Sequence, residues 1–367
     1  MVHAFYSSIF TILLLFILTA CAPVKSAVKE RYFWPPPPSE PKIEWLGNYT
    51  DERDLKSNVS VLDLLTGEKS ESSLHSPFYL TSDSEGKVVV GDLKAKLFWV
   101  LDFNTKTMAQ LGDSSMAGVV ESPSGVGFGP GGLVYAADNK ARKIYVVDKN
   151  SNKLIKVLDV SSMVTSIASL VIDIKKGRII IPDSKANIIA VFSLQGDLQF
   201  KFGEKGEGNG QFNLPLSVTI NSKGEMLVAD SFNARIQKFT SDGTFITSIG
   251  QRASGIGGLD LIKAVAVDSD DNIYVTDARN HYLTIFSPEG EVLMVLGGKY
   301  AQMPSTPLAV GGFLLPQGIY IDNNNKIYIA DMMNHRIQVY QYITDNYLKS
   351  NPVKSPVAVP PKSPGVK

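Results

Sequence analysis

The chain has 367 residues, of which 44% are hydrophobic, and its 36 Lys and Arg balance its 36 Asp and Glu. This length and apolar content suffice for a large globular core, and the balanced charge argues against a protein that binds nucleic acid through a strongly basic surface. The single cysteine rules out an intramolecular disulfide.

The first 20 residues have the pattern of a signal peptide. An apolar run extends from Ile9 to Leu18, which is too short to cross a membrane comfortably. The string LTAC that ends at Cys21 resembles a bacterial lipobox, in which the cysteine becomes the lipidated first residue of the mature protein. We therefore expect residues 1–20 to be cleaved and Cys21 to carry a lipid anchor in the cell envelope. Ala22, in place of an aspartate, favours the outer membrane; the alternative is an ordinary signal peptide followed by a chance cysteine.

Proline-rich segments flank the central part of the chain. Residues 21–42 include four consecutive prolines, 35–38, which impose an extended polyproline helix. We interpret residues 21–42 as a tether that holds the domain away from the membrane, with a ligand for a partner's aromatic groove as the alternative. Residues 346–367 consist mostly of Pro, Val, Lys and Ser, and we expect them to be disordered.

A pattern of short strands repeats six times between residues 43 and 345. It is clearest at 223–250, where three apolar or alternating runs are separated by turn residues. Each repeat has an aspartate after an apolar run, and a Gly, Asp or Asn lies six residues before that aspartate. The spacings are 46, 45, 47, 47 and 54 residues, between Asp92, Asp138, Asp183, Asp230, Asp277 and Asp331. Self-similarity at this period indicates a radial or stacked array.

Each repeat accommodates four antiparallel strands, with no helical pattern between them. We therefore predict an all-β fold, a six-bladed β-propeller with four antiparallel strands per blade. A β-sandwich is the alternative, although sandwiches do not repeat one signature six times. The sixth repeat lacks a fourth strand, and residues 43–47 resemble the fourth strands at 245–250 and 292–297. We predict that this N-terminal strand closes the ring of a propeller domain that spans residues 43–345.

Three strings in the later repeats resemble NHL repeats, namely MLVADSFNARIQKF, IYVTDARNHYLTIF and IYIADMMNHRIQVY. The string KFGEKGEGNGQFNLP, which begins at Lys201, is similar to the linker between such repeats. The resemblance covers residues 43–340 and is weaker in the first three repeats. Together with the N-terminal signal it implies an NHL-repeat six-bladed β-propeller lipoprotein of bacteria. It implies little about function, because propellers host many activities.

Two loops between repeats are longer than the fold needs, residues 48–76 before the first repeat and 298–313 before the sixth. Both flank the sixth blade on the face where the repeated aspartates lie, and extra loop length on a rigid scaffold often carries function. We predict that this face binds the partner, through loop side chains and through cations in the turns after the aspartates. The candidates are Leu62, Leu65, His75, Tyr300, Met303, Arg235, Arg279 and Arg336. The cations could instead pair locally with the aspartates.

The repeated aspartates also suggest a metal site, but a simpler role accounts for them. An aspartate at a strand end caps the following turn by accepting hydrogen bonds from backbone N–H groups, and six equivalent copies are what a repeated architecture produces. His281 and His335 belong to the repeat string and His3 to the signal, so only His75 lacks an explanation. We therefore predict no metal, no cofactor and no catalytic residue.

These observations favour a non-enzymatic binding or scaffold propeller of the bacterial cell envelope. Its partner would be another envelope protein or a small ligand, and the protein would be a monomer. Some NHL propellers bind RNA through a strongly basic face, whereas residues 43–345 contain 28 basic and 34 acidic residues, so that their net charge is about −6. Nucleic acid is thus not the expected partner. The alternative is a metal-dependent hydrolase or lyase that acts at the mouth of the central channel.

Overall fold

The computed structural model describes residues 30–36, 38–56, 72–255, 257–301 and 310–353. The signal peptide and Cys21 therefore lie outside the described residues. The chain divides into two units, 1–31 and 32–367, and the fold described below is that of the second. Its described part contains no helix with the length and apolar character needed to cross a membrane.

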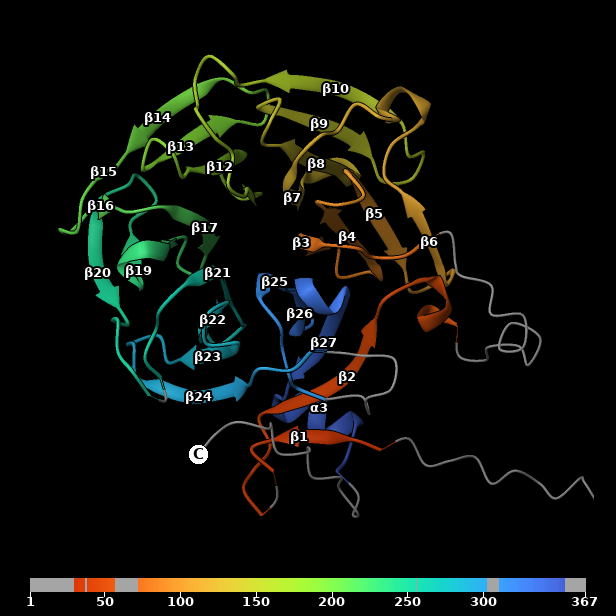
Figure 1. The fold of residues 1–367 in the computed structure, drawn as a ribbon, viewed down its shortest axis with the longest axis vertical. Coiled ribbons are helices and arrows are strands. Elements are labelled where there is room, and N and C mark those ends of the chain that lie inside the picture. Colours follow the sequence, from red (N-terminus) through yellow and green to blue (C-terminus); the bar gives the residue numbers. More distant parts are fainter. Residues whose placement is uncertain (1–29, 37, 57–71, 256, 302–309, 354–367) are drawn as a thin grey trace, which may run out of the picture. The chain divides into compact units, whose positions relative to one another are not determined.

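Six antiparallel sheets surround a central axis, which confirms the predicted six-bladed β-propeller (Figure 1). Within a blade the strands run from the axis outward. The first three blades contain β3 (Pro77–Ser82), β4 (Lys87–Asp92), β5 (Leu97–Asp102) and β6 (Thr107–Gln110); β7 (Pro123–Phe128), β8 (Leu133–Asp138), β9 (Lys143–Asp148) and β10 (Leu154–Asp159); and β11 (Val171–Asp173), β12 (Arg178–Asp183), β13 (Ile188–Ser193) and β14 (Leu198–Phe202). The next two contain β17 (Pro215–Ile220), β18 (Met226–Asp230), β19 (Arg235–Phe239) and β20 (Phe245–Ile249); and β21 (Ile262–Val267), β22 (Ile273–Asp277), β23 (Tyr282–Phe286) and β24 (Val292–Gly297).

The sixth blade joins the two ends of the propeller. Its inner strands are β25 (Pro316–Ile321), β26 (Lys326–Asp331) and β27 (Arg336–Tyr342), and its outer strand is β2 (Ile43–Tyr49). β2 pairs antiparallel with β27, with Ile43 opposite Tyr342. The predicted closure of the ring by an N-terminal strand is thus confirmed, and the strand continues two residues beyond the predicted 43–47.

A further strand corrects the predicted tether. β1 (Tyr32–Trp34) pairs antiparallel with β2 and adds a fifth strand to the sixth blade. The reason is apolar burial, because Phe33 is only 1% exposed and the ring of Trp34 meets that of Tyr340 edge to face at 6.0 Å. Of residues 21–42, Tyr32–Trp34 therefore belong to the sheet.

The C-terminal boundary also differs from the prediction. Residues 346–350, which we assigned to a disordered tail, lie in the short helix α3 (Asp345–Ser350). The Thr344 side chain caps this helix by accepting a hydrogen bond from the Tyr347 amide at 3.2 Å. The Tyr347 hydroxyl donates to Glu44 in β2 at 2.8 Å, so that the helix is tied to the closing strand.

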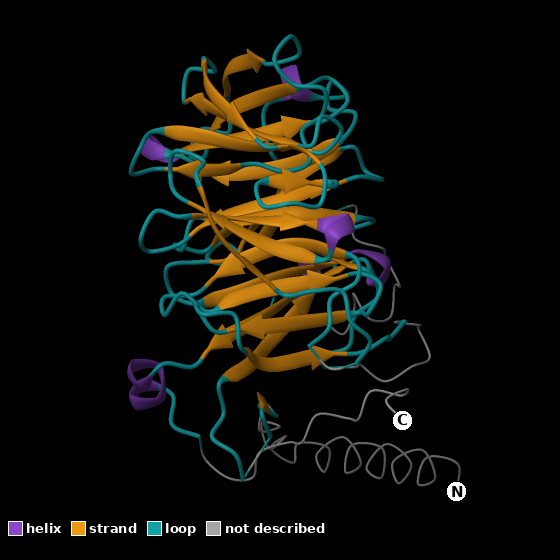
Figure 2. Ribbon diagram, turned by 90° about the vertical axis from the view of Figure 1, so that its left-hand side faces the viewer, coloured by secondary structure: helices purple, strands orange, loops and turns teal. Residues whose placement is uncertain are grey.

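The core lies between neighbouring blades. The second and third strands of a blade are covered on both sides, which is why they contain continuous apolar runs such as that of β12. Figure 2 shows the blades edge on, with strands running between two loop-covered faces. The remaining short elements are β15 (Glu204–Lys205), β16 (Gln211–Phe212), η1 (Glu52–Leu55), η2 (Ser114–Met116), η3 (Pro130–Gly132), η4 (Ser231–Asn233) and η5 (Met332–Asn334).

Candidate ligand site at the channel mouth

The propeller has two faces with different loops. The face here called the aspartate face carries the loops that enter each inner strand and the turns that follow the six repeated aspartates. The opposite face, here called the turn face, carries the turns between the first and second strands of each blade. The described part of the chain lets both faces be compared as binding surfaces.

On the aspartate face, the six carboxylates bind backbone amides. Asp92 accepts hydrogen bonds from the amides of His75 (2.6 Å) and Ser76 (3.0 Å), at the entrance to β3. It also accepts from the amides of Lys94 and Ala95 in the following turn. The other five aspartates each accept one such amide bond of 2.6 to 2.8 Å, from Glu121, Thr165, Asn213, Asp260 and Leu314. Each carboxylate therefore ties the inner strand of its own blade to the turn that follows its second strand.

The candidate arginines on this face differ in accessibility. Arg336 is 1% exposed; its Nε lies 2.8 Å from Asp331, and it also donates to the Gly312 carbonyl at 2.8 Å. Arg235 makes the equivalent pair with Asp230 at 2.9 Å. Arg279 remains well exposed and pairs with Asp260 at 3.1 Å. The expectation that Arg336 contributes to a binding surface is therefore corrected, because its charge is buried and used within the fold.

Of the other candidate binding residues, only His75 and Tyr300 are among the described residues. Leu62, Leu65 and Met303 lie outside the described residues. His75 is exposed, and its carbonyl contacts Nδ1 of His335. Tyr300 is half-buried; its amide donates to the Phe313 carbonyl at 2.9 Å, and its own carbonyl accepts from the Asn334 side chain at 2.9 Å. The structure thus places His75 and Tyr300 on the predicted face.

A cavity of about 120 Å³ lies in the central channel, lined by the inner strands. Tyr79, the third residue of β3, crosses this channel near its aspartate-face end. Its hydroxyl donates to the carbonyls of Leu216 (3.0 Å) and Lys263 (2.8 Å), in the fourth and fifth blades. Burial raises the pKa of the Tyr79 phenol well above its ordinary value, so the phenol stays protonated as a donor. Gly318 makes room for this crossing, since a Cβ there would lie 2.8 Å from the Tyr79 Cα.

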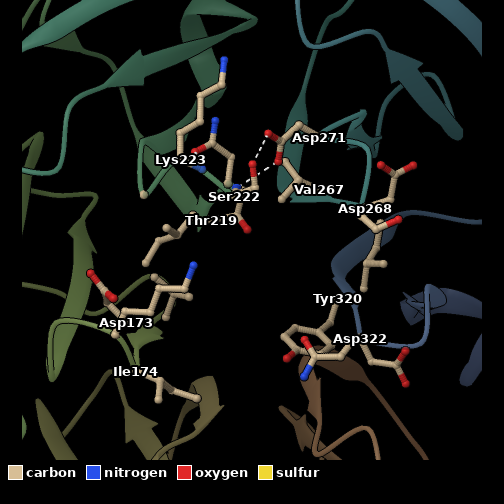
Figure 3. Close-up of a pocket in the computed structure, with 18 of the residues that line it drawn as sticks. Asp173, Ile174, Thr219, Ser222, Lys223, Val267, Asp268, Asp271, Tyr320 and Asp322 are labelled. Atoms are coloured by element: carbon tan, nitrogen blue, oxygen red, sulfur yellow. Dashed lines mark hydrogen bonds between the residues drawn. The ribbon is translucent and has the colours of Figure 1, made fainter.

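The channel opens on the turn face into a larger cavity of about 550 Å³. Turns of four blades form its rim, with residues 173–176, 221–224, 268, 269, 271, 322, 323 and 325. Figure 3 shows Asp173 and Ile174 across the opening from Tyr320 and Asp322. The two cavities adjoin, because seven residues line both; they are Val171, Ile172, Ile174, Thr219, Val267, Tyr320 and Ile321.

The carboxylates of this mouth already have protein partners. Asp173 pairs with Arg178 at 2.7 Å, and Asp271 accepts from the Ser222 hydroxyl at 2.6 Å. Asp268 accepts from the Tyr274 hydroxyl at 2.8 Å, while burial raises the pKa of the Asp268 carboxyl. Asp322 accepts from the Tyr328 hydroxyl at 3.1 Å. Within the described ranges, no group of three or more His, Cys, Asp and Glu side chains could hold a metal ion.

The cations of the mouth are less engaged. Lys176 donates to the Ser241 hydroxyl at 2.6 Å. Lys175 and Lys223 are exposed, and neither ammonium has a hydrogen-bond or ion-pair partner in the described part of the chain. Deeper in the channel, Ser169 is 3% exposed, and its hydroxyl likewise has no partner among the described residues. The arrangement offers charged groups at the rim and uncharged walls below.

Sequence reasoning did not identify this mouth, although a signal was present. The residues on the aspartate face repeat from blade to blade, as architecture requires. The turns of the opposite face vary, reading IKKG, SKGE, SDDN and NNNK in the third to sixth repeats. Variation on one rim of a regular array indicates that this rim is not constrained by the fold alone.

Fold and site define a six-bladed β-propeller with a ligand-sized cavity on its axis. A family model for the NHL repeat matches residues 313–340, which include β25, β26 and most of β27 of the sixth blade. No curated protein sequence matches the chain.

Several solved structures share the fold. One is a structural genomics protein of unknown function from Bacteroides thetaiotaomicron, with 15% identity, a TM-score of 0.59 and coverage of 74% of this chain and 70% of that one. A streptogramin B lyase has 13% identity, a TM-score of 0.51 and coverage of 74% and 94%. The hydrazine synthase of Kuenenia stuttgartiensis has 11% identity, a TM-score of 0.51 and coverage of 74% and 97%. At these identities the likeness shows the fold alone.

Proposed function

We propose that the protein is a non-enzymatic binding propeller that takes a small solute into the mouth of its channel on the turn face. The observation that carries the proposal is a pair of adjoining cavities, one of about 550 Å³ at the mouth and one of about 120 Å³ in the channel, where Tyr79 crosses near the far end. A concave site of this size, with charged groups at its rim and uncharged walls below, suits a small molecule.

Binding is favoured over catalysis by the state of the mouth carboxylates. Asp268 and Asp322 each accept hydrogen bonds from a tyrosine hydroxyl, and Asp173 is paired with an arginine. Groups held in this way stabilise the turns and are poorly placed to exchange protons or to coordinate a metal ion, as the alternative hydrolase or lyase would require.

The location is proposed from the N-terminal sequence. The apolar run before Cys21 supports export and lipidation, which would hold the propeller in the bacterial cell envelope, with the outer membrane favoured. The net charge of about −6 over residues 43–345 opposes nucleic acid as a partner. A solute-binding role would leave the propeller free to act as a monomer.

The test is a ligand-detected NMR screen of small polar and amphiphilic solutes against the purified full chain and two variants. Ile174→Trp adds bulk at the mouth, where Ile174 is 60% exposed. Phe232→Trp is the matched control, because Phe232 is 51% exposed on the aspartate face. We expect solutes that bind the wild type and the control but not Ile174→Trp. Binding that persists in Ile174→Trp, or a screen without any binder, would contradict the proposal.

A further inference from the structure

The inner part of the site is uncharged. None of the residues that line the channel cavity is an Asp, Glu, Lys, Arg or His. Its lining includes Val126, Val171, Val218, Val265 and Ile319, together with uncharged polar surface of about equal extent. At about 30 Å³ for one water-sized group, 120 Å³ accommodates roughly four carbon atoms in a row or a small cluster. A charged group in this space would lose its hydration without finding a counter-charge, so the channel accepts an uncharged stem.

Among the described charged residues that line the outer cavity, Lys175 and Lys223 are the ones whose side chains have no hydrogen-bond or ion-pair partner. Four carboxylates line the mouth, and protein donors occupy all of them, as described above. Lys175 and Lys223 come from the turns of neighbouring blades, and their exposed ammonium groups have no partner in the described residues. Figure 3 shows Lys223 at the rim, beside the hydrogen-bonded pair of Ser222 and Asp271. Flexible lysines of this kind can turn toward a bound anion without breaking an existing interaction.

We propose that the ligand is a short-chain organic anion whose aliphatic stem enters the channel and whose anionic head is bound by Lys175 and Lys223. This inference rests on the proposed function and names its ligand class. A cationic head would share each mouth carboxylate with an existing protein donor, such as the Tyr274 hydroxyl on Asp268, whereas an anionic head meets two ammonium groups without such partners.

The experiment measures the affinity of the purified full chain for four probes by titration calorimetry. The probes are hexanoate, acetate, hexylamine and hexan-1-ol, which separate the contribution of the stem from that of the head. We expect hexanoate to bind about tenfold or more tightly than acetate, because each buried methylene contributes roughly 0.8 kcal/mol. We also expect hexanoate to bind more tightly than hexylamine, with an affinity that falls as salt is raised.

Two sets of variants locate the probe. The pair Lys175→Gln and Lys223→Gln should weaken hexanoate about fivefold and leave hexan-1-ol unchanged. The matched control is Lys94→Gln with Lys96→Gln, which makes the same change of charge at exposed positions on the aspartate face. Ala266→Leu narrows the channel and should weaken hexanoate but not acetate. If Ala266→Leu lowers the melting temperature strongly, Val267→Phe at the junction of the two cavities replaces it.

Equal affinities for acetate and hexanoate would overturn the assignment of the stem. The assignment of the anionic head would be overturned if hexylamine binds more tightly than hexanoate. It would also be overturned if the Lys175/Lys223 variant and the Lys94/Lys96 control lose the same amount of affinity for hexanoate. A further outcome is that hexanoate fails to bind while other solutes bind to the wild type and not to Ile174→Trp. In that case the proposed ligand class is wrong and the proposed binding function stands. If no solute binds at the mouth, both are wrong.

Discussion

The guanidinium of Arg336 lies 2.8 Å from the carboxylate of Asp331, and both side chains are almost completely buried. Gln338 joins them by donating to Asp331 at 3.2 Å and to the Gly312 carbonyl at 2.7 Å. The same arrangement recurs in the fourth blade with Asp230, Arg235 and Gln237. The repeated aspartate is therefore one member of a buried network that holds the loop entering its blade.

The buried pair predicts a large effect of a single substitution. Arg336→Ala would leave Asp331 charged and without its ion-pair partner in the core, which costs about 3–5 kcal/mol for buried pairs. Arg279→Ala is the control, because Arg279 makes an exposed pair with Asp260, and such pairs contribute about 0–1 kcal/mol. Urea unfolding of both variants measures the difference. Similar losses in the two variants would show that burial of the pair has no energetic consequence.

The sequence predicts the repeated part of this structure because the repeat multiplies a weak signal. One run such as VVVG could belong to many folds, but six runs at nearly equal spacing define the blades, and the spare strand at Ile43 completes the ring. The ends of the domain were harder to place. The prolines at 35–38 suggested an extended tether, whereas the buried Phe33 just before them decides the local structure. The channel mouth depends on residues that do not repeat, so the repeat itself does not predict it, and only the variation of the turns on that face points there.

We predict that Phe33 accounts for much of the stability that β1, the fifth strand of the sixth blade, adds to the propeller. Phe33→Ala should destabilise the propeller by about 3–5 kcal/mol, because a fully buried aromatic side chain is removed from the sixth blade. Glu40→Ala, at an exposed position of the same segment, should change the free energy of unfolding by less than about 0.5 kcal/mol. Thermal unfolding measures both. If the melting temperature is unchanged in Phe33→Ala, β1 contributes nothing to the stability of the ring.

His281 predicts a loss of stability in acid. Its Nδ1 accepts a hydrogen bond from the Leu315 amide at 3.1 Å, which requires that nitrogen to be unprotonated. Burial, followed by the nearby charge of Lys299, lowers the pKa of the His281 imidazole. Because the pKa in the folded state lies below that of the unfolded chain, about 6.5, the stabilisation is present above pH 6.5 and is lost as the pH falls through the folded-state pKa.

The measurement is the free energy of unfolding at several pH values between 7.5 and about 5. His281→Gln removes the titrating group, so the fall in stability toward acid should be smaller than in the wild type. His335→Gln is the comparison, since His335 contacts the His75 carbonyl on the same face. An unchanged pH profile in His281→Gln would show that the Leu315 contact does not control acid stability.

We predict that a lipid on Cys21 anchors the protein to a membrane. Cys21→Ser should abolish lipidation and move the protein from the membrane fraction to the soluble fraction, because a serine cannot accept the thioether-linked lipid. Cell fractionation and mass measurement of the mature N-terminus provide the result. A variant that is cleaved normally and still fractionates with membranes would exclude a lipid anchor at this position.

We predict that Ser169 can be replaced by alanine without a loss of stability. Its hydroxyl is buried beside the channel and has no hydrogen-bond partner among the described residues, and an unsatisfied buried polar group costs about 1–3 kcal/mol. Ser169→Ala removes that hydroxyl and almost no apolar contact, so stability should stay the same or rise by up to about 1 kcal/mol.

Ser217→Ala is the matched control, because the Ser217 hydroxyl accepts from the Val265 amide at 3.3 Å and also lines the channel. That variant should lose stability, since the amide would be left unpaired. Chemical unfolding of the two variants separates the cases, and a loss in Ser169→Ala as large as in Ser217→Ala would show that the Ser169 hydroxyl is paired in solution.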